Sequence, residues 1–478
     1  MKMFIAGEWV TADEMRPVYN PYDNSVVDEM PVAKEAEVEK ALESAVRGAS
    51  VMEKMPYWKR SEIINKAADI FASRKENIAR LISQENGKTI NEARGEVDRT
   101  VTTLKSYADA IKSIFGETLP LTGYAANGVE NKFGFTYRVP YGVVLAISPF
   151  NMPVNIPGHK IAAALAAGNS VVFKSASDTP LAAVHLVESF LEAGLPEEAI
   201  QYITGSGGKL GVMLSADQRV RNICFTGSYA TGHEICKAAG MRKVVMELGG
   251  NAPVVVMPDA SIDRVVSTLS SNGYYMAGQA CVSPQRAYVH QSIYEEVIER
   301  MREAVTAKYV LGNPLDEQTT MGPLIRHADA VRVAETIGEV ASKGGRILCG
   351  GKLDGNFVTP AVVADCTQDM RICREELFGP AIAFMPFTDL DDAIEKANDT
   401  EYGLCAGLFT ESIEAAMQIA HRVKSGLMHI NSSNWRIDHM PNGGVKNSGI
   451  GKEGGIYGIL EMTESRTVIM HLTDRAPY

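Results

Sequence analysis

The expected fold rests on a short apolar stretch, Gly142-Val143-Val144-Leu145-Ala146-Ile147-Ser148. An apolar run without alternation is typical of a strand that is buried on both faces of a parallel sheet. Similar runs follow at residues 171–174 and 223–228, and helical patterns separate them. Strands that alternate with helices favour a doubly wound sheet. Because the alternation continues to about Gly426, the sequence predicts an α/β protein with more than one such sheet.

Length and composition limit the class of protein. A chain of 478 residues exceeds what one hydrophobic core usually serves, so we expect two or more domains. The net charge of -11 argues against a nucleic-acid partner, which requires a basic face. Seven cysteines without paired spacing predict a reducing compartment, no disulfide framework and no metal site. No apolar run suits a signal peptide or a membrane span, so we expect a cytoplasmic protein without a membrane partner.

The first third of the chain shows structural patterns but no obvious chemistry. Residues 1–30 contain short alternating runs that prolines interrupt, which predicts small strands and turns. From about residue 33 to residue 114 the apolar spacing is helical, for example at 60–74 and 78–84. Asn86-Gly87-Lys88 is a helix-stop signal. We interpret these helices as the packing layer of a nucleotide-binding domain.

Cys281 is the candidate nucleophile. It follows the small-residue turn Gly278-Gln279-Ala280, which would leave the sulfur open to a substrate. A buried structural thiol is the alternative, because free cysteine is among the most buried residue types. A second block, Glu247-Leu248-Gly249-Gly250-Asn251, begins 34 positions upstream. It places a carboxylate beside glycines that permit close backbone approach, and a thiol needs such a base to become a thiolate.

These two blocks and their spacing resemble the signatures of the aldehyde dehydrogenase superfamily, and the resemblance runs over essentially the whole chain. It implies a Rossmann-like cofactor domain and a catalytic domain, each with a doubly wound parallel sheet, together with a small β oligomerisation element. In relatives such strands leave the globule and pair across subunits, which implies a homodimer or a homotetramer. The implied limits are 1–125 and 141–246 for the cofactor domain, 247–430 for the catalytic domain, 126–140 and 463–478 for the oligomerisation strands, and 431–462 for a returning segment that lines the active site.

The resemblance assigns three catalytic roles. Cys281 would attack the aldehyde carbonyl, and Glu247 would activate the water that hydrolyses the thioester. Asn151, in the block Pro149-Phe150-Asn151-Met152-Pro153, would donate its amide to the oxyanion together with the backbone N–H of Cys281. By itself Asn151 is also an ordinary turn residue before a proline. The implied reaction is non-acylating oxidation of an aldehyde to a carboxylic acid.

Two other functions are weighed against this one. A coenzyme-A-acylating semialdehyde dehydrogenase is disfavoured, because relatives that pass the acyl group to coenzyme A typically lack the glutamate found here at Glu247. A catalytically silent binding protein of the same fold is the alternative from a different class. Intact Cys281, Asn151 and Lys174 argue against it. A thiol hydrolase would need a histidine base near Cys281, and no motif places one there.

The cofactor residues come from the resemblance, since the chain has no Gly-x-Gly-x-x-Gly fingerprint. Gly227 and Ser228 would lie by the pyrophosphate, where free N–H groups and the helix dipole favour an anion. An ordinary helix cap is the alternative interpretation of these two. Glu376 and Phe378 match residues that relatives place at the nicotinamide ribose and the nicotinamide ring. Lys174, at a strand end, completes the set.

Ser177 decides which nicotinamide cofactor we expect. Relatives that prefer NAD usually carry a glutamate three residues after the strand-end lysine, where it binds the ribose hydroxyls and repels a 2'-phosphate. In Lys174-Ser175-Ala176-Ser177 that place holds a serine. Lys174 would then be unopposed, and Ser177 can donate to a phosphate oxygen. We therefore expect NADP, with NAD also possible, and Lys209 as an additional cation or simply a solvent-facing one.

Four further residues predict a short polar or anionic aldehyde. Asn155 and His159 follow Asn151 by four and eight residues, so they share its face if the helix begins near Pro153. Asn442 replaces an aromatic residue of the family's block. The pattern beginning at Arg436 resembles that of dehydrogenases for lactaldehyde, phosphonoacetaldehyde and sulfolactaldehyde. Arg436 would grip a carboxylate, phosphonate or sulfonate with the help of His159. The alternative is that Arg436 has a structural role and pairs with Asp438 or with a carboxylate of another subunit.

Overall fold

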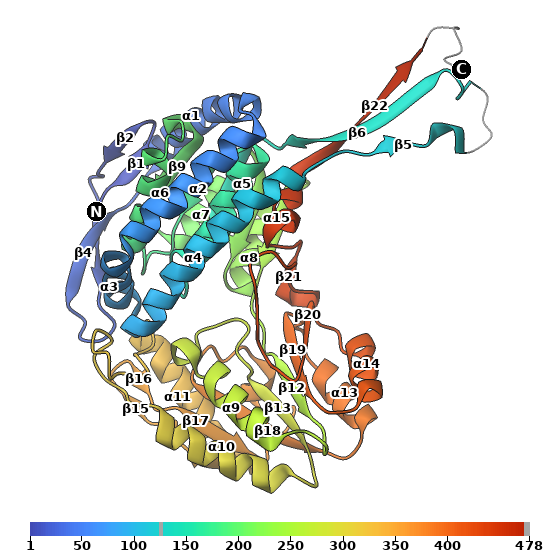
Figure 1. Cartoon of the computed structure of the whole chain (residues 1–478). Helices are drawn as coiled ribbons and strands as arrows, with labels where there is room; N and C mark the ends of the chain where they lie inside the picture. Colours follow the sequence, from blue (N-terminus) through green and yellow to red (C-terminus); the bar gives the residue numbers. More distant parts are fainter. Residues whose placement is uncertain (124–127, 473–478) are drawn as a thin grey trace.

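The protein consists of two α/β units, each built around its own sheet, and a narrow arm that leaves one of them (Figure 1). The structure is a computed structural model, and it describes residues 1–123 and 128–472. The predicted α/β architecture with two sheet-based units is confirmed. Among the described residues, none of the helices is both long and apolar enough to cross a bilayer.

The first sheet has eight strands in the order β2-β1-β9-β8-β7-β10-β11-β21. The five strands from β9 to β11 are parallel, which confirms the pattern of the apolar runs. Both edges are antiparallel, a feature that the apolar runs did not indicate. The strands are β1 (Met3–Ile5), β2 (Glu8–Val10), β7 (Val143–Ile147), β8 (Ser170–Lys174), β9 (Ile200–Ile203), β10 (Val220–Thr226), β11 (Lys243–Glu247) and β21 (Gly449–Ile450).

Helices cover both faces of this sheet, because alternate residues of its buried strands pack to opposite sides. Val144 packs in one core with α2 to α6, whereas Val143 and Leu145 pack in another with α1, α7 and α8. Gly87, with a φ of 84°, ends α3 as the sequence predicts. The helices are α1 (Glu35–Lys54), α2 (Tyr57–Ser73), α3 (Lys75–Asn86), α4 (Ile90–Ala110), α5 (Asn155–Ala167), α6 (Leu181–Glu192), α7 (Gly207–Ala216), α8 (Tyr229–Ala239) and α15 (Gly455–Glu461).

The second sheet has seven strands in the order β14-β17-β18-β13-β12-β19-β20. All of its pairings are parallel except that of the edge strand β14. The strands are β12 (Pro253–Val256), β13 (Arg286–His290), β14 (Arg346–Cys349), β17 (Ala361–Ala364), β18 (Ala381–Phe387), β19 (Cys405–Phe409) and β20 (Leu427–Ile430). Its helices are α9 (Ile262–Asn272), α10 (Tyr294–Lys308), α11 (His327–Ser342), α12 (Arg371–Arg374), α13 (Leu390–Asn398) and α14 (Ile413–Arg422).

The arm is a three-stranded antiparallel sheet that projects from the upper unit in Figure 1. It contains β5 (Thr118–Leu119), β6 (Lys132–Pro140) and β22 (Thr463–His471), so each of the segments 126–140 and 463–478 contains a strand. The expected oligomerisation segments also include residues 126–127 and 473–478, which lie outside the described residues. The small strands predicted near the start form the hairpin β3 (Met15–Tyr19) and β4 (Val26–Pro31), and a second hairpin pairs β15 (Leu353–Asp354) with β16 (Phe357–Val358).

Candidate active site

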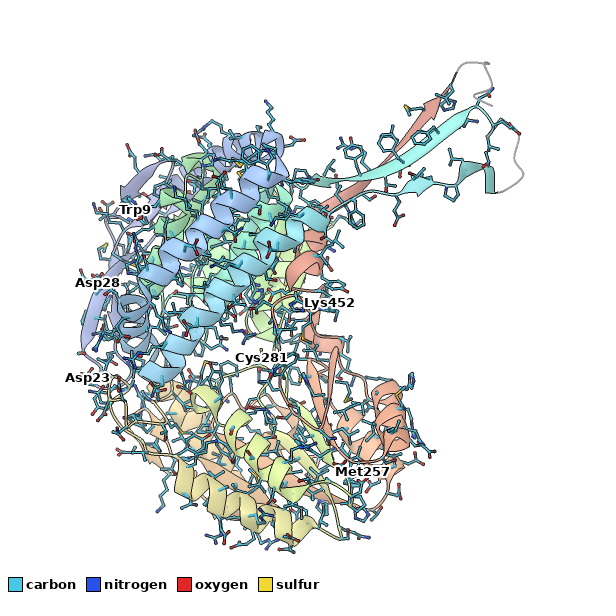
Figure 2. All side chains as sticks on the ribbon, in the orientation of Figure 1. Trp9, Asp23, Asp28, Met257, Cys281 and Lys452 are labelled. Carbon is cyan, nitrogen blue, oxygen red and sulfur yellow. The ribbon has the colours of Figure 1, made fainter. Side chains whose placement is uncertain are left out.

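A cleft of about 480 Å³ opens where the parallel strands of the first sheet end. Ile147, Lys174 and Thr226, the last residues of β7, β8 and β10, all line it. Ligands bind at this edge in open α/β sheets. The second unit contributes Cys281 to the same cleft, and Figure 2 shows Cys281 at the level where the two units meet.

The segment before Cys281 has an unusual backbone. Met276 and Ala277 have φ values of 52° and 53°, a left-handed conformation that costs free energy in residues other than glycine. Gly278, at φ 74°, lies so close to the backbone of Gly379 that a side chain would not fit. Burial, followed by the charges of Glu376 and Glu247, raises the pKa of the Cys281 thiol to about 12. The resting thiol is therefore protonated at neutral pH and needs a proton acceptor to attack.

Glu247, the last residue of β11, is suited to be that acceptor. Its side chain is buried, and Oε1 has no hydrogen-bond partner among the described residues. Burial, followed by the charge of Glu453, raises the pKa of the Glu247 carboxyl well above its usual range, as a general base requires. A side chain in place of Gly443 would contact Glu247 Oε1, so the turn at 442–443 lies directly against this carboxylate.

A buried ion pair behind Glu247 was not found from the sequence. Lys160 Nζ lies 2.6 Å from Glu453 Oε1, and both side chains are buried. Lys160, followed by His159, pulls the pKa of Glu453 down to about 2 against the effect of its burial. Glu453 is therefore a carboxylate at neutral pH. Its negative charge helps to keep Glu247 protonated to a higher pH.

Asn151 lies beside the nucleophile segment, as predicted. Its Nδ2 donates a hydrogen bond of 2.8 Å to the carbonyl of Gln279, two residues before Cys281. A side-chain amide carries two N–H groups, which leaves one for an oxyanion. The α5 helix begins at Asn155, two residues after the expected start near Pro153, so the condition for a shared face of Asn151 with Asn155 and His159 is not met.

At the cofactor end, Lys174 is buried and donates from Nζ to the carbonyl of Ser175 at 2.9 Å. Burial lowers the pKa of Lys174 to about 8. Ser177 lines the cleft and donates from Oγ to the carbonyl of Gly205 at 2.8 Å. Asp178, which also lines the cleft, interacts with Lys174, so Lys174 is not free of a neighbouring carboxylate as the sequence argument assumed. Lys209 is exposed.

Asp178 is itself held from the other unit. Arg326 Nε donates to Asp178 Oδ1 at 2.9 Å, and this arginine also lines the cleft. A guanidinium so placed offsets the negative charge that Asp178 brings to this part of the cleft. Neither residue was singled out from the sequence, because Arg326 lies 148 residues from Asp178 along the chain.

The other predicted cofactor residues also line the cleft. Ser228 caps α8, because its Oγ accepts from the N–H of Thr231 at 3.4 Å. The alternative interpretation as a helix cap is therefore correct, and the capped N-terminus of α8 also lines the cleft. Glu376 accepts from the N–H of Gly250 at 3.0 Å, and burial raises its pKa to about 7. Phe378 meets Phe150 edge to face, with ring centroids 5.8 Å apart. Gly227 completes the lining.

Two buried hydroxyls show that this cleft suits a polar ligand. Ser148 Oγ and Thr226 Oγ1 are buried without a hydrogen-bond partner among the described residues, and both residues line the cleft. Buried polar groups normally have partners, so these hydroxyls fit a ligand with hydrogen-bonding groups. The described lining, which runs from Ser228 to Cys281, therefore fits a ligand with several polar groups.

The predicted substrate residues Arg436 and His159 are in contact. Arg436 Nη2 lies 3.2 Å from His159 Nε2, and Arg436 Nε is buried without a partner among the described residues. Burial, followed by Arg436, lowers the pKa of His159 to about 4. The neutral ring accepts from Arg436, with Tyr107 Oη 3.2 Å from Nδ1. His159 therefore contacts the guanidinium of Arg436 and adds no positive charge of its own, so any help that it gives to Arg436 is by orientation.

Arg99 is the functional candidate that the sequence analysis missed. It lies on α4, half-buried, with Nε 3.6 Å from Asp438 Oδ1. Burial, followed by the charge of Arg436, lowers the pKa of Arg99, so the two guanidinium groups lie near each other. Arg436 itself lies 3.9 Å from Glu453, whereas Asp438 Oδ1 lies 3.6 Å from Arg99 Nε and 3.4 Å from His159 Nε2. No local pattern marks Arg99, because its partners come from a segment more than 300 residues later.

The contacts of Asn155 and Asn442 lie within the fold. Asn155 Nδ2 donates to Thr103 Oγ1 at 2.9 Å, which ties α5 to α4. Asn442 exchanges backbone hydrogen bonds with Glu453, and its Oδ1 is buried without a partner among the described residues. Asn442 thus fixes the turn next to Glu247, whereas the amide of Asn155 is used within the fold.

Cys281 and Asn151 line the same cleft, and the buried carboxylate of Glu247 interacts electrostatically with Cys281. A thiol with a base nearby is the arrangement that a cysteine nucleophile requires. The comparison with known families agrees: residues 9–468 match the aldehyde dehydrogenase family, and the chain belongs to it. The resemblance seen in the sequence is confirmed. The activity class of this family is oxidation of an aldehyde.

One relative and two solved structures are informative. The chain is 45% identical over 471 residues to 3-sulfolactaldehyde dehydrogenase of Priestia megaterium, covering 98% of each chain. NADP-dependent glyceraldehyde-3-phosphate dehydrogenase from Bacillus halodurans C-125, complexed with NADP, matches with a TM-score of 0.95 at 34% identity, over 98% of this chain and 99% of that one. NAD-dependent aldehyde dehydrogenase from Sinorhizobium meliloti matches with a TM-score of 0.95 at 32% identity, over 100% and 96%.

Proposed function

We propose that this protein oxidises a short anionic aldehyde to the carboxylic acid with NADP. The observation that carries the proposal is a pair of guanidinium groups beside Asp438 and His159: Arg99 Nε lies 3.6 Å from Asp438 Oδ1, and Arg436 Nη2 lies 3.2 Å from His159 Nε2. Arg436 Nε is buried without a partner among the described residues, and Arg436 also interacts electrostatically with Cys281 and Glu247. Two guanidinium groups can bind a carboxylate, phosphonate or sulfonate in forked hydrogen bonds. The similarity to an enzyme named for sulfolactaldehyde supports the same class of substrate.

The chemistry follows from the three catalytic groups. Glu247 accepts the proton of Cys281, and the thiolate attacks the carbonyl carbon. The second N–H of Asn151 and the backbone N–H of Cys281 stabilise the oxyanion. The bound nicotinamide supplies the acceptor for the hydride that leaves this carbon. Glu247, once it has released its proton to solvent, then takes a proton from the water that hydrolyses the Cys281 thioester.

The product of this chemistry is a free acid. A buried carboxylate with a raised pKa next to the thioester is what hydrolysis needs, whereas transfer to coenzyme A does not require it. The position of Glu247 therefore supports the non-acylating reaction over the acylating alternative. The convergence of Cys281, Asn151 and Glu247 likewise speaks against a silent binding protein.

The preference for NADP rests on Ser177 at the ribose end, together with the buried cation Lys174. The similarity to a structure solved with NADP supports it, and the similarity to an NAD-dependent enzyme leaves dual use open. Asp178 repels a 2'-phosphate less strongly than an unpaired carboxylate would, because Arg326 donates a hydrogen bond to Asp178 and offsets its charge.

We further propose that the arm pairs with another copy of the chain. Its exposed apolar side chains include Phe133, Tyr137, Ile469 and Met470. An exposed strand edge with apolar side chains tends to recruit another chain, and closed symmetric assemblies use such edges. Light scattering of the native protein should give a dimer or a tetramer, whereas deletion of β5 and β6 should give monomers.

A spectrophotometric screen tests the function. Sulfolactaldehyde, succinic semialdehyde, lactaldehyde and propanal would each be offered with NADP and with NAD, and formation of reduced cofactor would be followed. We expect the highest kcat/KM with an anionic aldehyde and NADP, and an acid product without coenzyme A. Equal efficiency with propanal, or a requirement for coenzyme A, would contradict the proposal.

A further inference from the structure

A buried ion pair lies at the start of α4, away from the groups that react. Lys88 Nζ is 2.5 Å from Glu96 Oε2, and the two side chains are 1% and 0% exposed. The sequence marked this place only as a helix stop. Burying two charges is costly, and apolar replacements of such pairs are often neutral or stabilising. Stability alone therefore gives no reason for this pair.

Both members of the pair hold the loop that carries Asn151. Lys88 Nζ donates to the carbonyl of Asn151 itself at 2.6 Å. Glu96 Oε1 accepts from the N–H groups of Val154 and Asn155 at 3.0 and 3.1 Å. The neighbouring Asn86 donates from Nδ2 to the carbonyl of Phe150 at 2.8 Å. Four backbone groups on either side of the Asn151 side chain are thus fixed from one helix junction.

The same junction also holds the beginning of the nucleophile segment. Lys88 Nζ lies 3.2 Å from Met276 Sδ, and Glu92 Oε1 accepts from the N–H of Met276 at 2.8 Å. Met276 is one of the residues with a left-handed backbone, a conformation that persists only where the surroundings impose it. Charged contacts to Met276 supply that constraint. The junction therefore spans the loop of Asn151 in one unit and the approach to Cys281 in the other.

We propose that Lys88 and Glu96 are positioning residues that set the amide of Asn151 at the correct distance from Cys281. The proposal rests on the proposed function, in which Asn151 stabilises the oxyanion. Oxyanion donors act only when they are preorganised within a fraction of an ångström. Loss of the pair should therefore slow the step that forms the oxyanion, while cofactor binding and the reactivity of the thiol stay as they are.

The test compares Lys88→Met with the matched control Lys75→Met, which removes a half-buried lysine of α3 that pairs with Asp98 on α4. Stopped-flow measurement of the first turnover should show the rate of reduced-cofactor formation falling about 100-fold in Lys88→Met, with KM changing less than about threefold. Alkylation of Cys281 by iodoacetamide needs no oxyanion donor, so its rate should stay within about twofold. Lys75→Met should behave like the native protein.

The proposal is overturned if folded Lys88→Met keeps the native first-turnover rate, or if alkylation slows by the same factor. If Lys88→Met does not fold, Lys88→Met/Glu96→Gln removes the unpaired charge, and it should fold yet remain slow. In an Asn151→Ala background Lys88→Met should add almost nothing, because both changes remove one interaction. Additive losses in that cycle would also overturn it.

These outcomes separate this inference from the proposed function. If the native protein forms no reduced cofactor with any aldehyde, the proposed function fails. If Asn151→Ala retains the native first-turnover rate, the oxyanion assignment fails. The proposed role of the Lys88–Glu96 pair fails in one case: Asn151→Ala slows the first turnover, but Lys88→Met keeps the native first-turnover rate.

Discussion

The two ends of the active site both present positive charge, but they do so differently. At the cofactor end the buried cation is Lys174, whose ammonium bonds to a backbone carbonyl and whose pKa is lowered to about 8. At the substrate end the cations are Arg99 and Arg436, and carboxylates lie 3.6 to 3.9 Å from them. A guanidinium keeps its charge at any physiological pH, whereas a buried lysine does not. Selection of the aldehyde should therefore be independent of pH, and selection of the cofactor should not.

The largest expected effect comes from the point where the two ends meet. Cys281→Ala should lower kcat at least about a thousandfold, because the covalent route is lost. Binding of NADP, measured by fluorescence titration, should be unchanged. Cys349→Ala, at a half-buried thiol on the edge strand β14, is the matched control and should keep native activity. Native turnover by Cys281→Ala would refute the assignment.

Glu247→Gln should separate the two halves of the reaction. Steady-state turnover should fall about 100-fold, since a general base typically contributes that much or more. A first burst of reduced cofactor should persist at lower rate. In the native enzyme the raised pKa means that the base is inactive below this pKa, so hydrolysis should accelerate as pH rises through it. Unchanged turnover in Glu247→Gln would exclude this role.

Ser177→Glu should change the cofactor preference from NADP towards NAD. A carboxylate at this place would repel a 2'-phosphate and accept from ribose hydroxyls, so kcat/KM with NADP should fall about tenfold or more relative to NAD. Activity with saturating NAD should remain, and the ratio between anionic and neutral aldehydes should not change. A native enzyme that prefers NAD would show that Asp178 already has this effect.

The smallest expected effect is the pH dependence of NADP binding. Lys174 is charged below its pKa of about 8 and loses its charge above it. The contribution of Lys174 to phosphate binding is therefore present at neutral pH and declines as pH rises through that value. Between about pH 7 and about pH 9 the Kd for NADP should rise several-fold, and the Kd for NAD should rise less. Parallel curves for both cofactors would assign the titration to another group.

The sequence was sufficient where the determinants are local. Apolar runs predicted β7, β8 and β10, and the motif around Cys281 pointed to a segment that the structure places in the cleft beside Asn151. The residues that were missed act across long separations. Arg99 lies on an ordinary amphipathic helix, and its partner Asp438 is distant in the sequence. In the sequence Lys88 is only part of a helix-stop signal, and the fold places its ammonium against the carbonyl of Asn151.

The errors have the same origin. That the ring of His159 is neutral could not be foreseen, because its burial is not revealed by any local pattern. Lys174 was taken to be unopposed because the side chain of Asp178 was not expected to turn into the cleft. The start of α5 lies two residues later than expected, so Asn151 is four residues before the helix instead of two.

The central claim is that the substrate end selects an anion. The most direct measurement is the ratio of kcat/KM for succinic semialdehyde to that for propanal, in the native protein, Arg436→Ala and Arg99→Ala. A charge-assisted pair is worth roughly 1.5 to 3 kcal/mol, so each substitution should lower this ratio at least about tenfold, through KM of the anionic aldehyde. Losses of the same size for both aldehydes would make the arginines structural and would contradict the account.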